Sequence, residues 1–409
     1  MTGSAPRIAV QRPNVAADGA SNGRFHRHGL IGWWDQDRLL SARALVLGVG
    51  ALGNEVVKNL CMLGVGHILI VDLDDVENSN LSRSPLFRER DEGRPKAEVA
   101  ACAARELFPS IQASWKRCDL VHELGWGHYL DADLIIAGLD GREARLDANR
   151  ACIRTNRAFF DGAIEGIDGV ARSFDGSGGP CYECTLGERD WQLVRHRRSC
   201  NMLSREEMRT GHVPTVATVA SIVAALQVQQ AVKHLHGMPV DHGSGLHVNG
   251  LSFEAWKVAY PRNEECYAHE PASGIERMPW SAASTTAGEV LAEAGRRAGR
   301  SAVLELRHDV LVGRDCSSCG FAEELDPPVV AGRARSGAGL CSRCGSEARL
   351  QTQHGVDPDS PLTGRTLAQL GVPPYDIVRL RCGSEYLDFL LDADASAWAG
   401  DSSVGKAAT

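Results

Sequence analysis

The sequence lacks the features that mark a nucleic-acid-binding or a membrane-spanning protein. Its 409 residues include 44 Lys and Arg against 52 Asp and Glu, a formal net charge of −8, whereas nucleic-acid binders normally carry a basic excess. A spanning helix needs ~20 predominantly apolar residues. The most apolar segment, 214–232, is interrupted by Thr, Ser and Gln, and its apolar positions recur at helical spacing. We therefore expect a buried helix there, and neither a nucleic acid nor a membrane as partner.

The number of cysteines excludes a framework in which every one is paired, because there are 13. Residues 1–23 lack the apolar core of a secretory signal and are expected to form a disordered arm. Without such a signal, C-x-x-C pairs favour a reducing, cytoplasmic location and metal sites. Hydrophobic residues make up 43% of the chain, too many for a disordered protein. At ~150 residues per domain, the length predicts two or three domains.

A glycine-rich turn follows the first buried strand, which is expected over 44–47. The turn is G-V-G-A-L-G, a helix is expected over 54–63, and a second strand over 67–71 ends at an acid. Glycines let the backbone approach phosphate, and a helix N-terminus offers free N–H groups. An acid ~20 residues after the glycines can bind ribose hydroxyls. The pattern predicts a nucleotide site rather than a packing turn, with the candidate residues Gly48, Gly50, Ala51, Gly53 and Asp72.

The segment after Asp72 does not suit a dehydrogenase. It has the sequence D-L-D-D-V-E-N-S-N-L-S-R, followed by G-R-P-K, and it places Asn80, Arg83 and Lys96 close behind the acid. Cations at that position suit a triphosphate, because they neutralise charge during attack on the α-phosphorus. A solvated charged loop is the alternative, and an NAD-dependent enzyme is the least favoured hypothesis.

These motifs resemble the MoeB/ThiF and ubiquitin-activating-enzyme family over roughly residues 24–269. The resemblance rests on R-F-H-R at 24–27, the glycine loop, D-x-D-x-V-x-x-S-N-L-x-R and G-R-P-K-A-E-V-A-A. Members use ATP and Mg²⁺ to adenylate the C-terminal Gly-Gly carboxylate of a ubiquitin-like or sulfur-carrier protein. The resemblance implies an α/β fold, a Rossmann-like ThiF-type adenylation domain whose mixed sheet is mostly parallel.

The resemblance also implies roles for single residues near the glycine loop. Asp72 matches the family's ribose acid, and Asp74 is the second acid of the same D-x-D motif. The family's phosphate-contacting residues are matched by Asn80, Arg83 and Lys96.

Two further residues match more distant parts of the family's site. Asp140, at the end of the apolar strand 134–137, matches a magnesium-linked aspartate, although Gly141 stands where the family usually has Asn. Arg27 matches an arginine that members insert into the partner subunit's ATP site, although His28 replaces the Gln that usually follows. The resemblance therefore implies a homodimer or a heterodimer.

Two sets of cysteines have the spacing of zinc ligands. Two C-x-x-C pairs 21 residues apart, each followed by Gly, predict a zinc ribbon, and four thiolates leave no open position, so this zinc is expected to be structural. The other pair follows G-G-P, and the family closes that site with R-N-P-x-C-x-x-C, where this chain has R-N-E-E-C-Y-A-H. The resemblance therefore implies a structural Cys₃His site, with unlinked thiols or a redox pair as alternatives. The expected ligands are Cys316, Cys319, Cys341 and Cys344 in the ribbon, and Cys181, Cys184, Cys266 and His269 in the other site.

Cys200 has no partner at metal-ligand spacing. It follows R-H-R-R in a loop expected between the first C-x-x-C and the helix near residue 213. Nearby cations lower a thiol pKa and favour the thiolate nucleophile. Family members that form a thioester, persulfide or acyl-disulfide place their cysteine in this segment, although Asn201 stands where many activating enzymes have Thr. Cys200 is therefore a catalytic candidate, with an incidental loop thiol as the alternative.

The last third of the chain predicts a smaller α+β domain that carries the ribbon. We expect a helix over 285–298 and strands over 302–311, 376–381 and 386–391. This order is compatible with a β-grasp, and T-L-A-Q-L-G-V-P-P-Y-D-I-V-R-L resembles the ubiquitin-fold domain that recruits the conjugating enzyme in eukaryotic activating enzymes. The expected parts are an arm over 1–23, the adenylation domain over 24–270, the C-terminal domain over 280–392 and a flexible tail over 393–409.

Three functional hypotheses follow. In the first, the chain adenylates a ubiquitin-like protein, captures it on Cys200 as a thioester and passes it to a conjugating enzyme. In the second, the adenylate of a sulfur-carrier protein is converted to a thiocarboxylate by a separate sulfur donor. In the third, the chain is a non-catalytic nucleotide-binding partner subunit, against which the joint presence of Asp72, Arg83, Lys96 and Asp140 argues.

Overall fold

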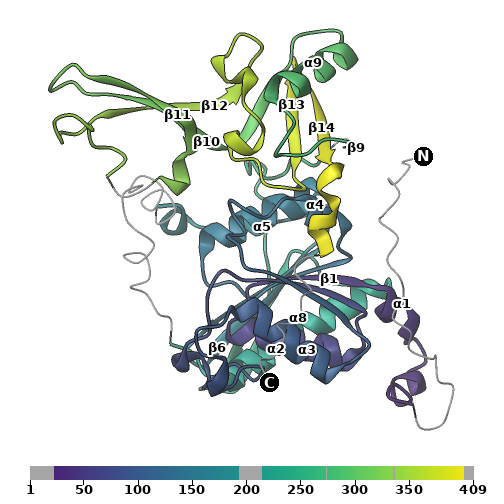
Figure 1. The fold of residues 1–409 in the computed structure, drawn as a ribbon. Coiled ribbons are helices and arrows are strands. Elements are labelled where there is room, and N and C mark those ends of the chain that lie inside the picture. Colours follow the sequence, from purple (N-terminus) through teal and green to yellow (C-terminus); the bar gives the residue numbers. More distant parts are fainter. Residues whose placement is uncertain (1–22, 193–213, 273, 335–336, 400–409) are drawn as a thin grey trace, which may run out of the picture.

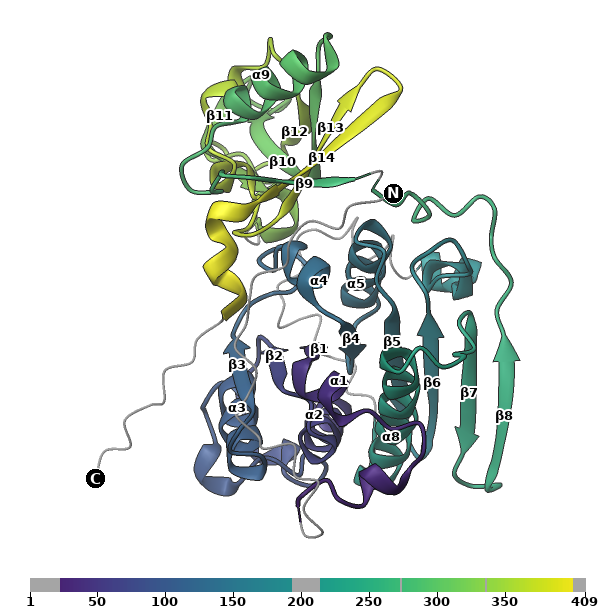
Figure 2. The same cartoon turned by 90° about the vertical axis from the view of Figure 1, so that its right-hand side faces the viewer.

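The computed structural model describes residues 23–192, 214–272, 274–334 and 337–399. These residues build two sheets, a large one in the lower body of Figure 1 and a small one above it. The large sheet has the strand order β3-β2-β1-β4-β5-β6-β7-β8, which Figure 2 shows across the page. Its strands are β1 (Arg43–Leu47), β2 (His67–Val71), β3 (Gln112–Lys116), β4 (Leu134–Ala137), β5 (Phe159–Glu165), β6 (Asp168–Phe174), β7 (Ser244–Asn249) and β8 (Glu254–Ala259).

Strands β1 to β5 are parallel, and β6 to β8 extend the sheet antiparallel. Every residue of β1, β2 and β4 is buried, because helices cover both faces. One face packs on α2, α3 and α8, and the other on α4 and α5. The helices are α1 (Gln36–Ser41), α2 (Ala51–Leu63), α3 (Lys96–Leu107), α4 (Gly127–Asp131), α5 (Arg142–Arg154), α8 (Ala217–Leu235) and α9 (Ala287–Ala298).

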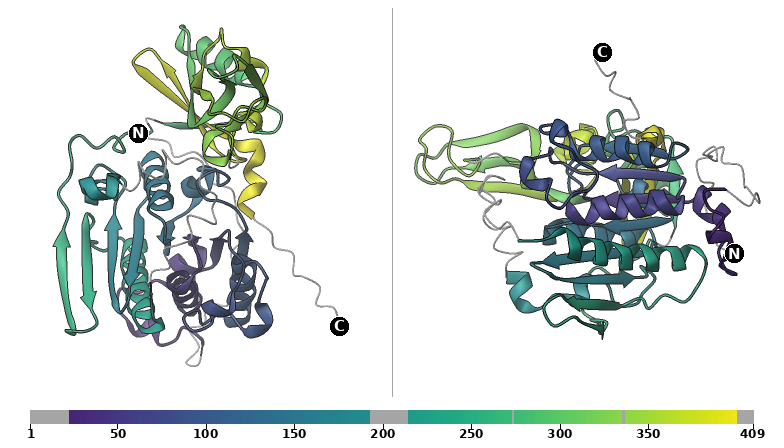
Figure 3. Two further views of the ribbon diagram at one scale, coloured as in Figure 1. Left: turned by 90° about the vertical axis from the view of Figure 1, so that its left-hand side faces the viewer. Right: turned by 90° about the horizontal axis from the view of Figure 1, so that it is seen from below.

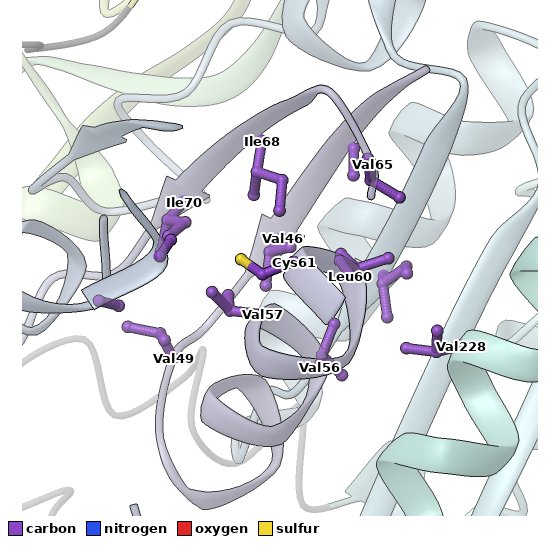
Figure 4. Packing of buried hydrophobic residues seen from close by; sticks show 14 of the residues in the cluster. Val46, Val49, Val56, Val57, Leu60, Cys61, Val65, Ile68, Ile70 and Val228 are labelled. Carbon is purple, nitrogen blue, oxygen red and sulfur yellow. The ribbon is translucent and has the colours of Figure 1, made fainter. Parts of the chain in front are cut away.

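Alternate residues of each central strand point to opposite faces, as the period of a strand requires. Val46 of β1 and Ile68 of β2 pack with Val57 and Leu60 of α2 in the first core (Figure 4), while Leu45 and Leu69 pack in the second. The predicted buried helix near 214–232 is confirmed as α8, which lies across α2 and β5. Among the described residues, no helix is long and apolar enough to span a membrane.

The small sheet has the order β11-β10-β13-β14-β9, with β12 also paired to β10. Helix α9 packs on it, capped by Thr286, whose side chain accepts a hydrogen bond from the Glu289 N–H. Its first strand is parallel to β14, which makes the sheet mixed. Its strands are β9 (Ile275–Met278), β10 (Val303–Asp315), β11 (Ala322–Val330), β12 (Arg349–Val356), β13 (Ile377–Cys382) and β14 (Glu385–Leu391).

Strand β10 is longer than the expected 302–311. Its first residues pair with β13 and with the end of β12, and its last residues pair with β11 and the rest of β12. The strand therefore continues into an arm that stands out to one side of the molecule (Figures 1 and 3) and carries the ribbon cysteines. The β-grasp interpretation and the domain boundaries stay predictions.

Candidate nucleotide site and metal centres

The glycine loop joins β1 to α2 by close backbone contact. Gly48 has φ +78°, a conformation that favours glycine. A Cβ on Gly53 would collide with the Gly48 carbonyl oxygen, and a Cβ on Gly138 would lie 2.8 Å from the Gly53 nitrogen. The helix begins at Ala51, three residues before the expected Asn54, because Gly53 fits inside its first turn against the Gly48 carbonyl.

The N-terminus of α2 is free to bind an anion. Gly50 is its N-cap and provides no capping side chain, and a Cβ placed there would meet nothing within 4 Å. The first N–H groups of a helix need partners, and the helix dipole favours a negative charge beside them. The loop therefore fits a phosphate group.

Asp72 ties the acid end of β2 to the glycine loop. Its carboxylate accepts hydrogen bonds from the Val49 N–H at 2.7 Å and from the Asp74 N–H at 2.8 Å. Burial raises the pKa of Asp72, and the Lys96 ammonium and these two hydrogen bonds lower it. The predicted ribose acid thus lies directly beneath the predicted phosphate loop.

Lys96 lies beside the same acids. Residues 93–96 pair with residues 74–76, and the Lys96 N–H donates to the Asp74 carbonyl at 2.9 Å. The Lys96 ammonium forms an ion pair with the Asp74 carboxylate at 3.1 Å. The structure therefore brings together three predicted residues, Asp72, Asp74 and Lys96, from segments 20 or more positions apart in sequence.

Asn80 and Arg83 make local contacts. The buried Asn80 side chain accepts a hydrogen bond from the Glu77 N–H at 3.0 Å, and Arg83 donates to the Ser79 carbonyl at 2.7 Å. Sequence reasoning missed Asn54, which donates to the Gly50 carbonyl and accepts from the Leu86 N–H, both at 3.0 Å. It fastens the glycine loop to the loop after Arg83. Its only signal was a polar residue in an apolar helix.

Asp140 is exposed after the carboxyl end of β4, next to β1. Sequence reasoning missed the buried cluster beside it, in which Asp161 pairs with Arg145 at 2.9 Å and with Arg172 at 2.6 Å. Arg145 also donates to the Gly162 carbonyl at 3.1 Å and to the Leu139 carbonyl. These bonds hold residue 139, which joins the end of β4 to Asp140, against β5.

Arg27 is exposed and lies far from its own glycine loop. Phe25 packs against Gly64, directly after the C-terminal end of α2. The glycine loop is at the other end of this helix, whose 13 residues span ~20 Å at 1.5 Å per residue. An arginine two positions from Phe25 therefore lies far from the glycine loop of its own chain.

Both predicted cysteine sets are assembled. In the first set the Cys181 sulfur lies 3.7 Å from those of Cys184 and Cys266, and the Cys184 sulfur lies 3.4 Å from His269 Nε2. Ligands ~2.3 Å from a tetrahedral zinc stand ~3.7 Å apart, whereas disulfide sulfurs stand ~2.0 Å apart. The distances therefore fit a zinc ion held by three thiolates and an imidazole.

The ribbon set has the same geometry. The Cys316 and Cys344 sulfurs lie 3.5 Å apart, and those of Cys319 and Cys341 lie 3.7 Å apart, so this set too could hold zinc. Cys200 lies outside the described residues. The remaining cysteines are core or partly buried residues, as expected: Cys61, Cys102, Cys118, Cys152 and Cys382.

Comparison with known proteins agrees with this geometry. The sequence pattern of the ThiF family matches residues 24–268. The chain is 31% identical to the SAMP-activating enzyme E1 of Haloferax volcanii over 270 residues, 62% of this chain and 90% of that protein. It is 36% identical to the NEDD8-activating enzyme E1 catalytic subunit of Saccharomyces cerevisiae over 156 residues, 36% of this chain and 52% of that protein. It therefore spans about half the length of the yeast relative.

The fold is similar to that of a solved structure, E. coli MccB with ATP. The TM-score is 0.51 at 22% identity, over 62% of this chain and 75% of that one. The chain therefore belongs to the ThiF family, an ATP-using family of activating enzymes and adenylyltransferases.

Proposed function

We propose that this chain adenylates the C-terminal glycine carboxylate of a ubiquitin-like or sulfur-carrier protein. The observation that carries the proposal is the cluster at the glycine loop, where Lys96 lies beside Asp74 and Asp72 supports the loop. A dinucleotide site needs no lysine there, whereas a triphosphate does.

Each residue then has a task in the reaction. The N–H groups at the start of α2 and the Lys96 ammonium bind phosphate oxygens, and Asp72 binds the ribose. A carboxylate oxygen of the carrier forms a bond to the α-phosphorus, the α–β P–O bond breaks, and pyrophosphate leaves. Lys96 and Arg83 stabilise the charge that develops. Asp140 would hold Mg²⁺, which neutralises phosphate charge.

An exposed apolar patch beyond the carboxyl end of β5 supports a protein substrate. Strand β5 continues four residues beyond its last pairing with β4, which is ~13 Å at 3.3 Å per residue, and the tip of β5–β6 lies beside the β7–β8 turn and the start of α8. In that turn Leu251 is 84% exposed and Phe253 97% exposed, a display typical of a docking surface. The patch consists of Ile167, Val216, Leu251 and Phe253.

The later steps rest on residues that act beyond this site. Cys200 would capture the acyl group as a thioester with release of AMP, and the C-terminal domain would hold a conjugating enzyme. If Cys200 has no such role, a separate sulfur donor would convert the adenylate to a thiocarboxylate. Arg27 would complete the ATP site of a partner subunit. Both zinc ions would be structural, since neither ligand set leaves an open position.

Pyrophosphate exchange tests the proposal. The full chain is incubated with ATP, labelled pyrophosphate and β-grasp proteins ending in Gly-Gly, each paired with a version lacking the two glycines. We expect exchange only with the intact C-terminus, and we expect its loss in Lys96→Ala but not in Cys200→Ala. Absence of ATP binding, or exchange indifferent to the glycines, would overturn the proposal. A carrier adduct that is lost in Cys200→Ala and cleaved by hydroxylamine selects the thioester route; carrier thiocarboxylate without such an adduct selects the sulfur route.

A further inference from the structure

Residues 117–127 follow strand β3 of the large sheet, on the side of the candidate nucleotide site, and pack against the small sheet. This connecting loop follows β3, which lies beside the acid-bearing β2. We propose that the small sheet sets the geometry of the nucleotide site through this connecting loop, and that Arg307 of β10 is the positioning residue. The inference rests on the proposed nucleotide binding, and it assigns a role to contacts that the reaction itself does not use.

The first end of the connecting loop holds the acids of the site. The Asp72 N–H donates to the Lys116 carbonyl at 3.2 Å, so β3 continues alongside the ribose acid. Arg117 donates to the Leu73 carbonyl at 3.2 Å and pairs with Asp75 at 2.7 Å. A shift of Arg117 would therefore move the backbone on both sides of Asp74.

The middle of the connecting loop is a compact turn. The Asp119 carboxylate accepts from the Val121 N–H at 3.1 Å and contacts the His122 ring at 3.0 Å, and the Glu123 N–H donates to the Asp119 carbonyl at 2.8 Å. These bonds make the turn move as a unit, so displacement at one end reaches the other.

The second end is gripped by a largely buried arginine of the small sheet. The Arg307 guanidinium donates to the Val121 carbonyl at 3.1 Å and to the Leu124 carbonyl at 3.3 and 3.4 Å. It also pairs with Asp376 at 3.1 Å and lies 5.1 Å from the centroid of the Trp126 ring. Arg307 thus satisfies two loop carbonyls and one buried carboxylate with a single charged group.

Backbone contacts complete the junction. The Trp126 N–H donates to the Asp376 carboxylate at 2.7 Å, and the Gly127 N–H donates to the Tyr375 carbonyl at 2.9 Å. A Cβ on Gly125 would collide with the Pro374 carbonyl oxygen, and one on Gly127 would lie 2.5 Å from that of Tyr375. Because the backbone of the connecting loop packs directly on residues 374–375, we infer that the small sheet holds the connecting loop in one conformation.

Two substitutions on one strand test the inference in the full chain. Arg307→Met removes the grip on the connecting loop. Arg314→Met is the matched control, because Arg314 is also a largely buried arginine of β10 but pairs with Glu323 and ribbon carbonyls. Arg307→Lys keeps the charge and should recover part of the loss. The measurements are the Kd for ATP by calorimetry and hydrogen exchange of residues 117–127.

We expect Arg307→Met to raise the Kd and the KM for ATP about 5- to 30-fold, with kcat at saturating ATP within about twofold and faster exchange over 117–127. Arg314→Met should change none of these. An ATP Kd that is unchanged in Arg307→Met while the wild type binds ATP would overturn the inference alone, whereas a wild type that binds no ATP would overturn the proposed function. If Arg307→Met fails to fold, His308→Ala, which removes one 2.8 Å contact to the Val121 carbonyl, must raise the Kd in the same direction.

Discussion

At the scale of single residues, Asp147 is a buried carboxyl group whose pKa is shifted by folding. It lies on α5, and burial raises its pKa to about 6, against a partial lowering by the Arg307 guanidinium. One of its oxygens has no hydrogen-bond partner. In the unfolded chain the pKa is 3.8, so between these values the folded state binds more protons. Asp147 therefore destabilises the protein increasingly as the pH rises from about 4 to about 6.

The substitution Asp147→Asn should remove this dependence. A pKa difference of about two units corresponds to ~3 kcal/mol. The unfolding free energy of Asp147→Asn minus that of the wild type should therefore increase by up to that amount between pH 4 and pH 7. Urea denaturation of both proteins at the two pH values measures it, and the zinc sites cancel in the difference. Two parallel stability–pH curves would contradict the assignment.

The residues of the candidate site that could be predicted are those that belong to a short sequence motif. Asp72 and Lys96 follow motifs of fixed spacing, and both lie at the glycine loop. Arg307 and Asp147 belong to no motif, because their partners lie far away in sequence; Arg307 contacts Val121 across 186 positions. Only a fold can bring such pairs together.

At the scale of elements, two glycines of the glycine loop should have different roles, Gly53 in folding and Gly50 in binding. Gly53→Ala places a Cβ against the Gly48 carbonyl, and overpacking of this kind costs ~1–3 kcal/mol. Gly50→Ala meets no atom, so the fold should keep its melting temperature, but the methyl group would stand where a phosphate approaches α2. We expect a lower Tm for Gly53→Ala, and for Gly50→Ala an unchanged Tm with an ATP Kd raised at least about tenfold. Equal effects of the two on Tm would contradict this division.

A further prediction concerns the arm that carries the ribbon cysteines. Cys319→Ser removes one ribbon ligand and should lower the zinc content from about two ions per chain to about one, with new proteolytic cleavage confined to residues 316–350. Ser318→Ala, inside the same knuckle but not a ligand, is the control. Elemental analysis and limited proteolysis check both variants. A zinc content that stays at about two in Cys319→Ser would contradict the role of Cys319 as a ligand, and a wild-type content of about one would show that only one of the two sets holds an ion.

Short-range patterns predicted most elements but not their full extents. Strands 67–71 and 134–137 match β2 and β4, because unbroken apolar runs are typical of strands buried on both faces. The expected start of α2 was wrong because the glycine turn suggested a loop, whereas Gly53 packs against the Gly48 carbonyl as part of the first turn of the helix. The length of β10 was missed because its last four residues, V-G-R-D, carry no alternating apolar pattern.

At the scale of the whole molecule, the position of Arg27 predicts shared active sites. Arg27→Ala and Lys96→Ala should each be inactive alone, because every site in either homodimer lacks one group. Mixing them with subunit exchange gives mixed dimers in which one site is complete, so about a quarter of the sites should recover. Pyrophosphate exchange measures the recovery. A mixture that stays inactive would rule out a homodimer with shared sites.

The glycines of the junction between the two sheets have a consequence for protein engineering. At Gly125 and Gly127 the connecting loop packs directly on the backbone of residues 374–375, so a side chain added at either position would force the two apart. A chimera that grafts the small sheet of another family member onto this chain must therefore keep both glycines and offer a matching backbone at 374–375. Grafts that preserve surface charges but lose this backbone fit are expected to assemble poorly, and those that preserve it should tolerate wide exchange of the exposed arm.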